Sequence, residues 1–450
     1  MRGRRVVLAG GPAAVWTAFV APLRDLGASD ILVVATDGLG AGPQPDATTV
    51  ATDIADDVRP MERIRITLAT LADPPPAIVD AVEAFDPDGT AVVFGTFLAE
   101  SPTLVGRPLV AHRRSEWVAL EDKTAVDALL DYAGIVRAPS VTVDVADAPA
   151  SWRPFDAGSG TVWAVDARDG FHGGGAGTRW VTDDDEAVAV TAELSRMGDS
   201  VRIMPFLEGI ATSIHGIVLP DGVVALRPVE MVTLRRGHEL RYAGCATFWD
   251  PPEEIRAEMR DVARRVGERL RADVDFRGAF TIDGVATVEG FRPTELNPRF
   301  GAGLGVITLG LGDLPLHLVL DLVVAGIPLA ISAAELERRI VDGADARRSG
   351  GTSLLHVDTP VEVTGRDASY VDGAWRWSVD GEPVDAKVVA KGGFMRALYE
   401  ADRTPVGVSV GQRSVDFWRF ADAELGTNIG PLTAPVDVTS SVLPRPSTRP

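Results

Sequence analysis

Short apolar runs near the start of the chain alternate with stretches of helical periodicity. The runs cover residues 6–9, 31–35 and 91–94, and each is followed within three residues by glycine. A short continuous apolar run that ends at a turn residue is typical of a buried strand, and alternation of such strands with helices is typical of a parallel sheet. We therefore predict that residues 1–118 form an open α/β domain whose first strand is Arg5–Ala9.

Farther along, the pattern changes to strands joined by hairpins, with helices between them. Strand-like runs are expected at residues 161–167, 201–204, 214–219, 223–226 and 278–297. Helical periodicity is expected at residues 121–133, 183–197, 253–270, 313–324 and 333–341. The glycine-rich residues after 297 are interpreted as a turn. The chain therefore continues from the α/β domain into a region of mixed strands and helices.

The last part of the chain has its own short strands and carries no catalytic motif that we recognise. We expect residues 331–435 to form a separate mixed α+β domain. The last fifteen residues contain three prolines and several Ser and Thr residues, a composition typical of a frayed end. Residues 436–450 are therefore expected to be a disordered tail.

Composition narrows the classes of partner. The chain has 450 residues with a formal net charge of −20, and so acidic a surface repels phosphodiester polymers. No apolar run approaches the ~18–20 residues needed to cross a bilayer. The single cysteine, Cys245, permits no internal disulfide and fits a reducing cytoplasm. We therefore expect a cytoplasmic protein with a buried thiol, whose partners are small molecules rather than nucleic acid or a membrane.

Lysine is rare in this chain. The 44 basic residues include only three lysines, and Lys123 is the only one before Lys387. Lys123 lies at the start of the predicted helix 121–133, where a cation opposes the helix dipole and calls for an anionic partner. An ammonium group that binds phosphate is one interpretation, and a surface lysine without a ligand is the other.

The segment 278–301 carries the strongest chemical signal. Glu295 and Asn297 are two residues apart on a predicted strand and therefore share a face. Asp283 lies on the preceding strand and comes opposite them if the two strands pair as a hairpin. Two carboxylates and an amide oxygen on one face form an oxygen site suited to Mg²⁺. Arg299 follows and could hold a phosphate or the charge that develops on an acyl phosphate.

A glycine-rich segment, 171–179, lies between two predicted strands. It holds four glycines: Gly173, Gly174, Gly175 and Gly177. Without side chains, their backbone N–H groups can close over phosphates, with Arg179 following. A hairpin loop without a ligand explains the segment equally well.

The segment Met204–Gly209 ends an apolar strand with Glu-Gly. Met204, Phe206 and Leu207 could sandwich an adenine ring, and Glu208 could accept hydrogen bonds from ribose hydroxyls. A simple strand exit is the alternative.

Three polar residues lie in or beside the predicted hairpin that precedes the longest helix. His215 and Arg227 could reach a substrate carboxylate, and Glu230 could reach an incoming amine. A core histidine and surface charges are the alternatives for these positions.

In their order and spacing, these segments resemble the ATP-grasp superfamily of carboxylate–amine ligases over about residues 1–330. The sequences HGGGAG, FLEG, RPVEM and PTELNPRFG are most similar to those of actinobacterial peptide ligases of the pheganomycin type. The resemblance implies an α/β protein with the ATP-grasp fold. Its open α/β pre-ATP-grasp domain would be followed by subdomains at 119–205 and 206–330, and then by the C-terminal mixed α+β domain.

The same resemblance implies roles for individual residues. By the family pattern, the carboxylates and amide of segment 278–301 hold magnesium, the glycine loop covers the phosphates, and Met204–Leu207 binds adenine. Lys123 matches a lysine that contacts the nucleotide phosphates. Two positions depart from the pattern, with Asp166 at a position that is often lysine and Thr281 at one that is often arginine. Because a carboxylate cannot replace an ammonium group, we expect Arg168 or Arg179 to substitute, or the nucleotide to bind differently.

The expected activity is formation of an amide from a carboxylic acid and an amine, with ATP and Mg²⁺ as cofactors and an acyl phosphate as intermediate. Arg299 and Arg227 are the candidate catalytic residues, and His215 and Glu230 the candidate substrate contacts. The resemblance implies amino-acid or peptide-like substrates in secondary metabolism, and a homodimer is the candidate assembly. A non-catalytic nucleotide-binding partner protein and an ATP-grasp kinase remain the alternatives.

Overall fold

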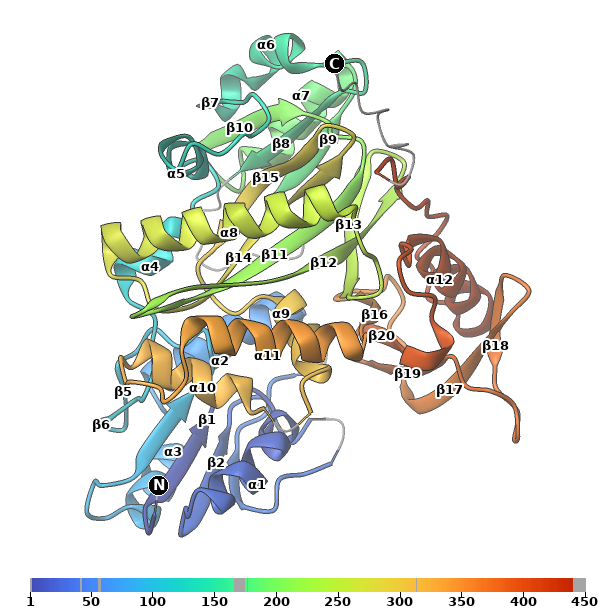
Figure 1. The fold of residues 1–450 in the computed structure, drawn as a ribbon. Helices are drawn as coiled ribbons and strands as arrows, with labels where there is room; N and C mark the ends of the chain where they lie inside the picture. The colour runs from blue at the N-terminus through green and yellow to red at the C-terminus, as the bar shows by residue number, and fades with distance from the viewer. Residues whose placement is uncertain are drawn as a thin grey trace, which may run out of the picture. The chain divides into compact units, whose positions relative to one another are not determined.

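The chain folds into two compact units, which are described separately. The computed structural model describes residues 2–40, 43–55, 58–165, 175, 177–312 and 314–439. The first unit comprises Met1–Ala119, Phe276–Ala279 and Asp313–Ser332 (Figure 1). The remainder of the chain forms the second unit. The first unit therefore includes two segments from far along the sequence in addition to its N-terminal residues.

The first unit is built on a parallel sheet with strand order β3-β2-β1-β4. Its strands are β1 (Arg5–Ala9), β2 (Asp30–Ala35), β3 (Thr48–Ala51) and β4 (Val92–Gly95), with the small hairpin β5 (Thr103–Leu104) and β6 (Arg107–Pro108). Its helices are α1 (Thr17–Asp25), α2 (Pro60–Ala72), α3 (Pro76–Phe85), α4 (Ser115–Val118) and α10 (Leu316–Val324). The first strand has the bounds expected from the sequence.

Both faces of this sheet are buried, which explains the continuous apolar runs. Val6 and Leu8 of β1 pack into one core with Leu23 of α1. The alternate residue Val7 packs into the other core with Leu71 of α2. Helices therefore cover both faces of the sheet, as expected for a parallel sheet in an α/β protein.

In its described residues, the second unit contains three antiparallel sheets. The first has the order β7-β10-β8-β9, with β7 (Val141–Asp144), β8 (Thr161–Val165), β9 (Thr178–Val181) and β10 (Ser200–Pro205). The second has the order β13-β12-β11-β14-β15, with β11 (Ile210–Leu219), β12 (Gly222–Arg236), β13 (Glu239–Ala246), β14 (Gly278–Thr287) and β15 (Gly290–Asn297). The third has the order β16-β20-β19-β17-β18, with β16 (Gly351–Leu354), β17 (Val363–Val371), β18 (Ala374–Trp377), β19 (Ala386–Lys391) and β20 (Phe394–Tyr399).

Helices cover these sheets. They are α5 (Val126–Tyr132), α6 (Ala148–Ser151), α7 (Asp184–Leu194), α8 (Glu253–Val274), α9 (Ala302–Leu309), α11 (Ala333–Ala346) and α12 (Gly411–Leu425). Figure 1 shows α8 crossing one face of the second sheet, where its apolar stripe contacts β11 and β12. Gly267 of α8 and Gly216 of β11 both approach the ring of Phe280, and a Cβ at either position would overlap its neighbours. Small residues therefore allow the close packing of this helix on the sheet.

Several expected elements have different bounds in the structure. The helix predicted at 121–133 begins only at Val126, so Lys123 lies in the turn before it. The glycine-rich segment after 297, expected as a turn, contains α9. Its sequence AGLGVITL is apolar enough to be held by burial against the sheet despite its glycines. In physical terms, tertiary packing has overridden weak helix propensity.

The C-terminal region shares its core with the second sheet. Residues of α12 and the third sheet lie in one buried cluster with Val232 and Leu234 of β12 and Ala243 of β13. Trp375, Tyr399 and Phe417 form ring contacts within it. Part of the expected tail is also ordered, because Asp437 accepts a hydrogen bond of 2.9 Å from the indole nitrogen of Trp249. Residues 440–450 of that expected tail lie outside the described residues.

Among the helices that the structure describes, none combines the length and the apolar character needed to cross a membrane.

Candidate active site

The strands β14 and β15 pair as a hairpin, which is the condition that the sequence argument set for this site. Asp283 stands directly opposite Glu295, and Thr281 stands opposite Asn297. Because alternate residues of a strand share a face, all four side chains project from one face of the sheet. The sequence segment 278–301 therefore places two carboxylates and an amide side by side.

The Asp283 carboxyl group is held at both oxygens. Ser213 of β11 donates a hydrogen bond of 2.6 Å to Oδ1, and Nδ2 of Asn297 donates one of 3.0 Å to Oδ2. Burial raises the pKa of Asp283, and the nearby charge of Glu295 raises it further. Two carboxyl groups so placed favour a cation between or beside them.

Arg299 continues the same group of side chains. Its Nε donates to Glu121 at 2.8 Å, and one Nη donates to Oδ1 of Asn297 at 3.0 Å. Glu121 ends a short 3-10 turn, Ala119–Glu121, which precedes α5. The ion pair fixes the direction of the guanidinium beside the carboxylates.

Lys123 belongs to this neighbourhood. Its positive charge, like that of Arg299, lowers the pKa of Asp283 against the effect of burial. The turn that carries it is closed by Asp122, whose Oδ1 accepts hydrogen bonds from the backbone N–H and the hydroxyl of Thr124 at 2.7 and 2.6 Å. The structure therefore places the rare lysine near the paired carboxylates.

The donor set fits a hard divalent cation. Within the described part of the chain, no cluster of three or more His, Cys, Asp or Glu side chains is arranged as a metal site. A cation bound here would have the carboxylates of Asp283 and Glu295 and the amide oxygen of Asn297 as its protein ligands. Its remaining coordination positions would be filled by water or phosphate oxygens. Mg²⁺ is commonly bound through one or two carboxylates in this way.

The candidate adenine segment lies at the end of β10. Met204 and Phe206 are buried, and the Phe206 ring stacks on Trp180 with centroids 4.0 Å apart. The Arg235 guanidinium lies over both rings and pairs with Glu208 at 3.0 Å. Glu208 therefore has a protein partner, Arg235. This cluster could not be predicted from the sequence, because Arg235 is distant along the chain.

The glycine loop is described only in part. Gly173 and Gly174 lie outside the described residues, as do Asp166 and Arg168. Gly175 and Gly177 have positive φ angles of 79° and 77°, a conformation that favours glycine.

Arg179 follows the glycine loop on β9. Its Nε donates to Glu193 of α7 at 3.0 Å, and one Nη forms a second, shorter contact with the same carboxylate. The bidentate pairing occupies the guanidinium, so the structure does not support Arg179 as the substitute phosphate ligand.

His215 is a core residue. Its Nδ1 lies 2.8 Å from Oγ1 of Thr281, its Nε2 faces Gly303 of α9, and the side chain is fully buried. Burial lowers the pKa of His215 to about 3, so the ring is neutral. This placement corrects the expectation that His215 contacts a substrate carboxylate.

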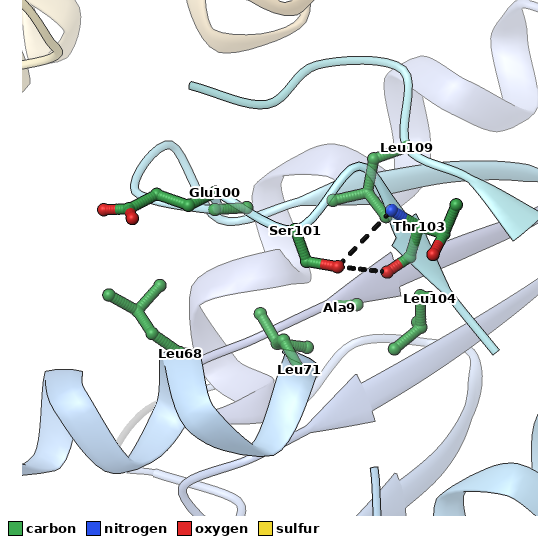
Figure 2. A pocket seen from close by; sticks show the side chains of 9 residues that line it. Ala9, Leu68, Leu71, Glu100, Ser101, Thr103, Leu104 and Leu109 are labelled. Atoms are coloured by element: carbon green, nitrogen blue, oxygen red, sulfur yellow. Dashed lines mark hydrogen bonds between the residues drawn. The ribbon is translucent and has the colours of Figure 1, made fainter. Parts of the chain in front are cut away.

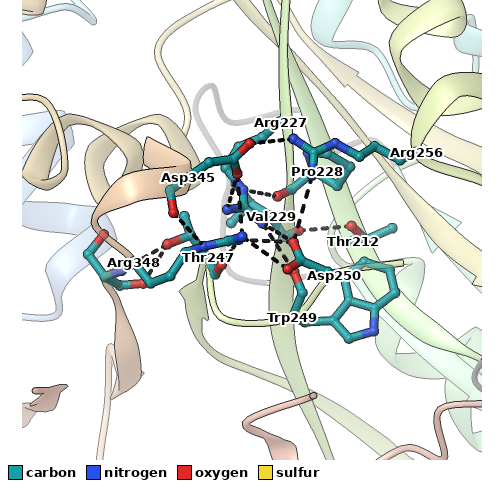
Figure 3. A network of polar contacts seen from close by, with 11 residues as sticks. Thr212, Arg227, Pro228, Val229, Thr247, Trp249, Asp250, Arg256, Asp345 and Arg348 are labelled. Carbon is teal, nitrogen blue, oxygen red and sulfur yellow. Dashed lines mark hydrogen bonds and ion pairs between the residues drawn. The ribbon is translucent and has the colours of Figure 1, made fainter. Parts of the chain in front are cut away.

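Arg227 is the centre of a buried ion network. Its two Nη atoms pair with Asp250 and Asp345, each at 2.7 Å, and the side chain is fully buried. Arg256 and Arg348 complete the network, in which Figure 3 shows Arg227 between the two aspartates. The network joins β12 to α8 and α11, so Arg227 stabilises the packing and the expectation of a catalytic contact is corrected.

Glu230 faces away from the site. Ser213 pairs with Val229, so the next residue, Glu230, projects from the opposite face to Ser213 and Asp283. Its carboxylate accepts hydrogen bonds from the hydroxyl of Ser409 and the backbone N–H of Val410. Glu230 therefore anchors the start of α12 and does not meet an amine bound at the carboxylates.

Cys245 is a free, buried cysteine, as expected from the sequence. Burial raises the pKa of its thiol to about 11. A thiol that stays protonated is a poor nucleophile.

A small cavity in the first unit lies beside the end of β1. Figure 2 shows its lining, which is mainly apolar: Ala9, Leu68, Leu71, Ala99, Leu104 and Leu109, with Glu100, Ser101 and Thr103. Its volume of about 10 Å³ matches a single water molecule. It is too small to hold a nucleotide or an amino acid.

No protein-family model matches the chain, and no curated protein matches it in sequence. Solved structures match it in fold. Biotin carboxylase from Campylobacter jejuni, in a β-γ-ATP complex, has 14% identity and a TM-score of 0.56, covering 88% of this chain and 87% of that chain.

The biotin carboxylase domain of Hydrogenobacter thermophilus 2-oxoglutarate carboxylase, in complex with MgADP, ADP and bicarbonate, has 14% identity and a TM-score of 0.55, covering 94% and 90%. N5-carboxyaminoimidazole synthase from Aspergillus clavatus, in complex with ADP and 5-aminoimidazole ribonucleotide, has 14% identity and a TM-score of 0.51, covering 89% and 95%. These similarities confirm the predicted ATP-grasp fold class. The similarity to pheganomycin-type ligases stays a prediction from the sequence.

Proposed function

We propose that this protein is an ATP- and Mg²⁺-dependent ligase that joins a carboxylic acid to an amine. The observation that carries the proposal is the group formed by Asp283, Glu295, Asn297 and Arg299 on one face of the β14–β15 hairpin. The structures with a similar fold that were solved with ADP or MgADP support a nucleotide at this site. Magnesium, when bound, would offset the negative charge of the phosphates.

The surrounding residues would hold the nucleotide at both ends. Lys123 would add a positive charge toward the phosphates, because it already acts electrostatically on Asp283. Met204–Leu207 would contact the adenine, with Met204 and Phe206 supplying buried apolar surface. Gly175 and Gly177 would let backbone N–H groups approach the phosphates.

The reaction would proceed in two steps. An oxygen of the substrate carboxylate attacks the γ-phosphorus, the bond from phosphorus to ADP breaks, and an acyl phosphate forms. The amine then attacks the acyl carbon, the bond from that carbon to the phosphate oxygen breaks, and the amine releases a proton. Arg299, fixed by Glu121 and Asn297, would stabilise the negative charge of the phosphoryl group and of the tetrahedral intermediate.

Positioning and charge neutralisation suffice for this chemistry. Neither step needs a protein nucleophile, which agrees with the buried, protonated Cys245 and the neutral His215. A carboxyl-activating reaction therefore fits the side chains at the site.

The finer proposal is that the enzyme forms peptide bonds in secondary metabolism. It is supported by the similarity of PTELNPRFG and HGGGAG to segments of pheganomycin-type peptide ligases. The acid would then be an amino acid or a peptide-like molecule.

The test is incubation of the purified protein with ATP, Mg²⁺ and pools of amino acids, with analysis by mass spectrometry. The expected result is that ADP, phosphate and an amide are formed together, and that none of the three products is formed without the other two. A phosphorylated alcohol as the stable product would instead select a kinase. Nucleotide binding without turnover in any pool would favour a non-catalytic partner protein.

A further inference from the structure

Arg202 of β10 is a buried arginine to which the proposed reaction assigns no role. Its side chain is 1% exposed. Nε and one Nη donate to the two carboxylate oxygens of Asp127 at 2.9 and 2.6 Å. The other Nη donates to the backbone carbonyl of Thr294 at 3.0 Å and lies 3.5 Å from the sulfur of Met204. A guanidinium buried to this degree needs such partners, because burying an unpaired charge is strongly unfavourable.

These three contacts lead to three parts of the proposed nucleotide site. Asp127 lies in the first turn of α5, directly after the turn that carries Lys123. Thr294 precedes Glu295 on β15, and its hydroxyl donates to the backbone carbonyl of Asp283 at 3.3 Å. Met204 begins the candidate adenine segment. The Arg202 side chain therefore connects the turn that carries Lys123, the strand that carries Glu295 and the candidate adenine segment.

Arg202 is not itself a phosphate ligand. Asp127 binds one edge of the guanidinium, through Nε and one Nη, in a bidentate pair and offsets its charge. Asp127 is fixed in turn by the hydroxyl of Ser140 and by Arg137 at 3.5 Å. The planar fork of arginine reaches Asp127 and the Thr294 carbonyl at the same time, and lysine, as a single point donor on a flexible stem, cannot reproduce that geometry.

We propose that Arg202 is a positioning residue that sets the distance between the Lys123 turn and the Glu295 strand. It thereby couples binding of the nucleotide phosphates to binding of the divalent cation. The inference rests on the proposed function, because both sites belong to the nucleotide site proposed above. It adds a residue whose action is indirect, through Asp127 on one side and the Thr294 carbonyl on the other.

The test is the Arg202→Lys substitution in the full chain, with ADP binding measured by calorimetry in Mg²⁺ and in EDTA. The ratio of the two dissociation constants reports the coupling between nucleotide and cation. We expect affinity for ADP in EDTA to fall and the enhancement by Mg²⁺ to fall by about tenfold, within the range typical of coupling between sites. Lys123→Ala should lower the affinity for ADP equally in EDTA and in Mg²⁺ and so leave the enhancement unchanged, whereas Glu295→Gln should lower the enhancement.

The matched control is Arg107→Lys. Arg107 forms a buried ion pair with Asp86 at 2.7 Å in the first unit, so its loss reduces stability without touching the nucleotide elements. Wild-type ADP affinities and Mg²⁺ enhancement in Arg202→Lys, together with the same loss of thermal stability as in the control, would overturn the inference. If Arg202→Lys does not fold, Asp127→Asn removes one partner with little change in volume and should weaken ADP binding in the same way.

The outcomes separate this inference from the proposed function. Absence of ADP binding by the wild-type protein would refute the proposed nucleotide site, and with it the role of Arg202. ADP binding by the wild type that is unchanged in both Arg202→Lys and Asp127→Asn would refute only the role of Arg202.

Discussion

Asp283 and Glu295 face each other across the β14–β15 hairpin, and the negative charge of Glu295 adds to burial in raising the pKa of Asp283. The Asp283 carboxyl group is fixed by Ser213 and Asn297, so it cannot rotate away from Glu295 without losing two hydrogen bonds. A divalent cation relieves this repulsion.

Glu295→Gln tests the pair directly. Removing one negative charge should weaken Mg²⁺ binding and lower turnover by about 100-fold or more, as for loss of a group that stabilises transition-state charge. Cation binding is followed by calorimetry and folding by circular dichroism. Glu289→Gln is the control, because Glu289 lies in the turn of the same hairpin with its side chain 78% exposed. Near-normal turnover and Mg²⁺ affinity in Glu295→Gln would refute the assignment.

Lys123→Ala should weaken ADP binding. The ammonium group acts on the charge at the site, and loss of one charge-assisted contact costs about 1.5–3 kcal/mol, or about tenfold or more in affinity. Lys387→Ala is the control, because this exposed lysine lies on β19 of the C-terminal sheet. Equal ADP affinities in the two variants would make Lys123 an ordinary surface lysine.

Glu230 should make stability depend on pH. Burial raises the pKa of its carboxyl group from 4.5 to about 7. Between these values the folded state holds a proton that the unfolded state has released, so the free energy of unfolding falls as pH rises through this window. The side chain of the Glu230→Gln variant stays uncharged at all pH values. The free energy of unfolding of the variant minus that of the wild type should therefore be more positive at pH 8 than at pH 4. Urea unfolding at both pH values measures this, and a pH-independent difference would contradict it.

Two glycines of α9 give a steric test of the buried His215. An added Cβ at Gly303 would overlap the imidazole ring, whereas one at Gly305 would make only an ordinary contact, 3.8 Å from Phe300. Gly303→Ala should therefore destabilise the protein by about 1–3 kcal/mol. Gly305→Ala should be neutral or stabilising by up to about 1 kcal/mol, because alanine is the better helix former. Thermal unfolding compares the two, and equal melting temperatures would show that His215 is not packed against α9.

The sequence was sufficient for features that depend on local pattern. Strand alternation predicted that Asp283 comes opposite Glu295 if the two strands pair as a hairpin, and β14 and β15 pair in this way. The first strand, Arg5–Ala9, could be predicted because a continuous apolar run with a following Gly-Gly turn has few other interpretations.

Features that depend on distant partners could not be predicted. Arg299 pairs with Glu121 across 178 residues, and Ser213 reaches Asp283 across 70 residues. For the same reason Arg227 and Arg179 looked available for a ligand, although aspartates and a glutamate from other elements bind them. A charged side chain in a sequence shows what it can bind, and only the fold shows what it does bind.

The proposed reaction depends on attack of the substrate carboxylate on ATP to form an acyl phosphate. This step is tested by supplying acid substrates labelled with ¹⁸O in the carboxylate and analysing the phosphate released. In the proposed reaction one carboxylate oxygen becomes the oxygen that bridges carbon and phosphorus, and it leaves with phosphate when the amine attacks. We predict one ¹⁸O atom in each phosphate released with amide. Amide formation with unlabelled phosphate, or ATP turnover that leaves both labels in the acid, would contradict the account.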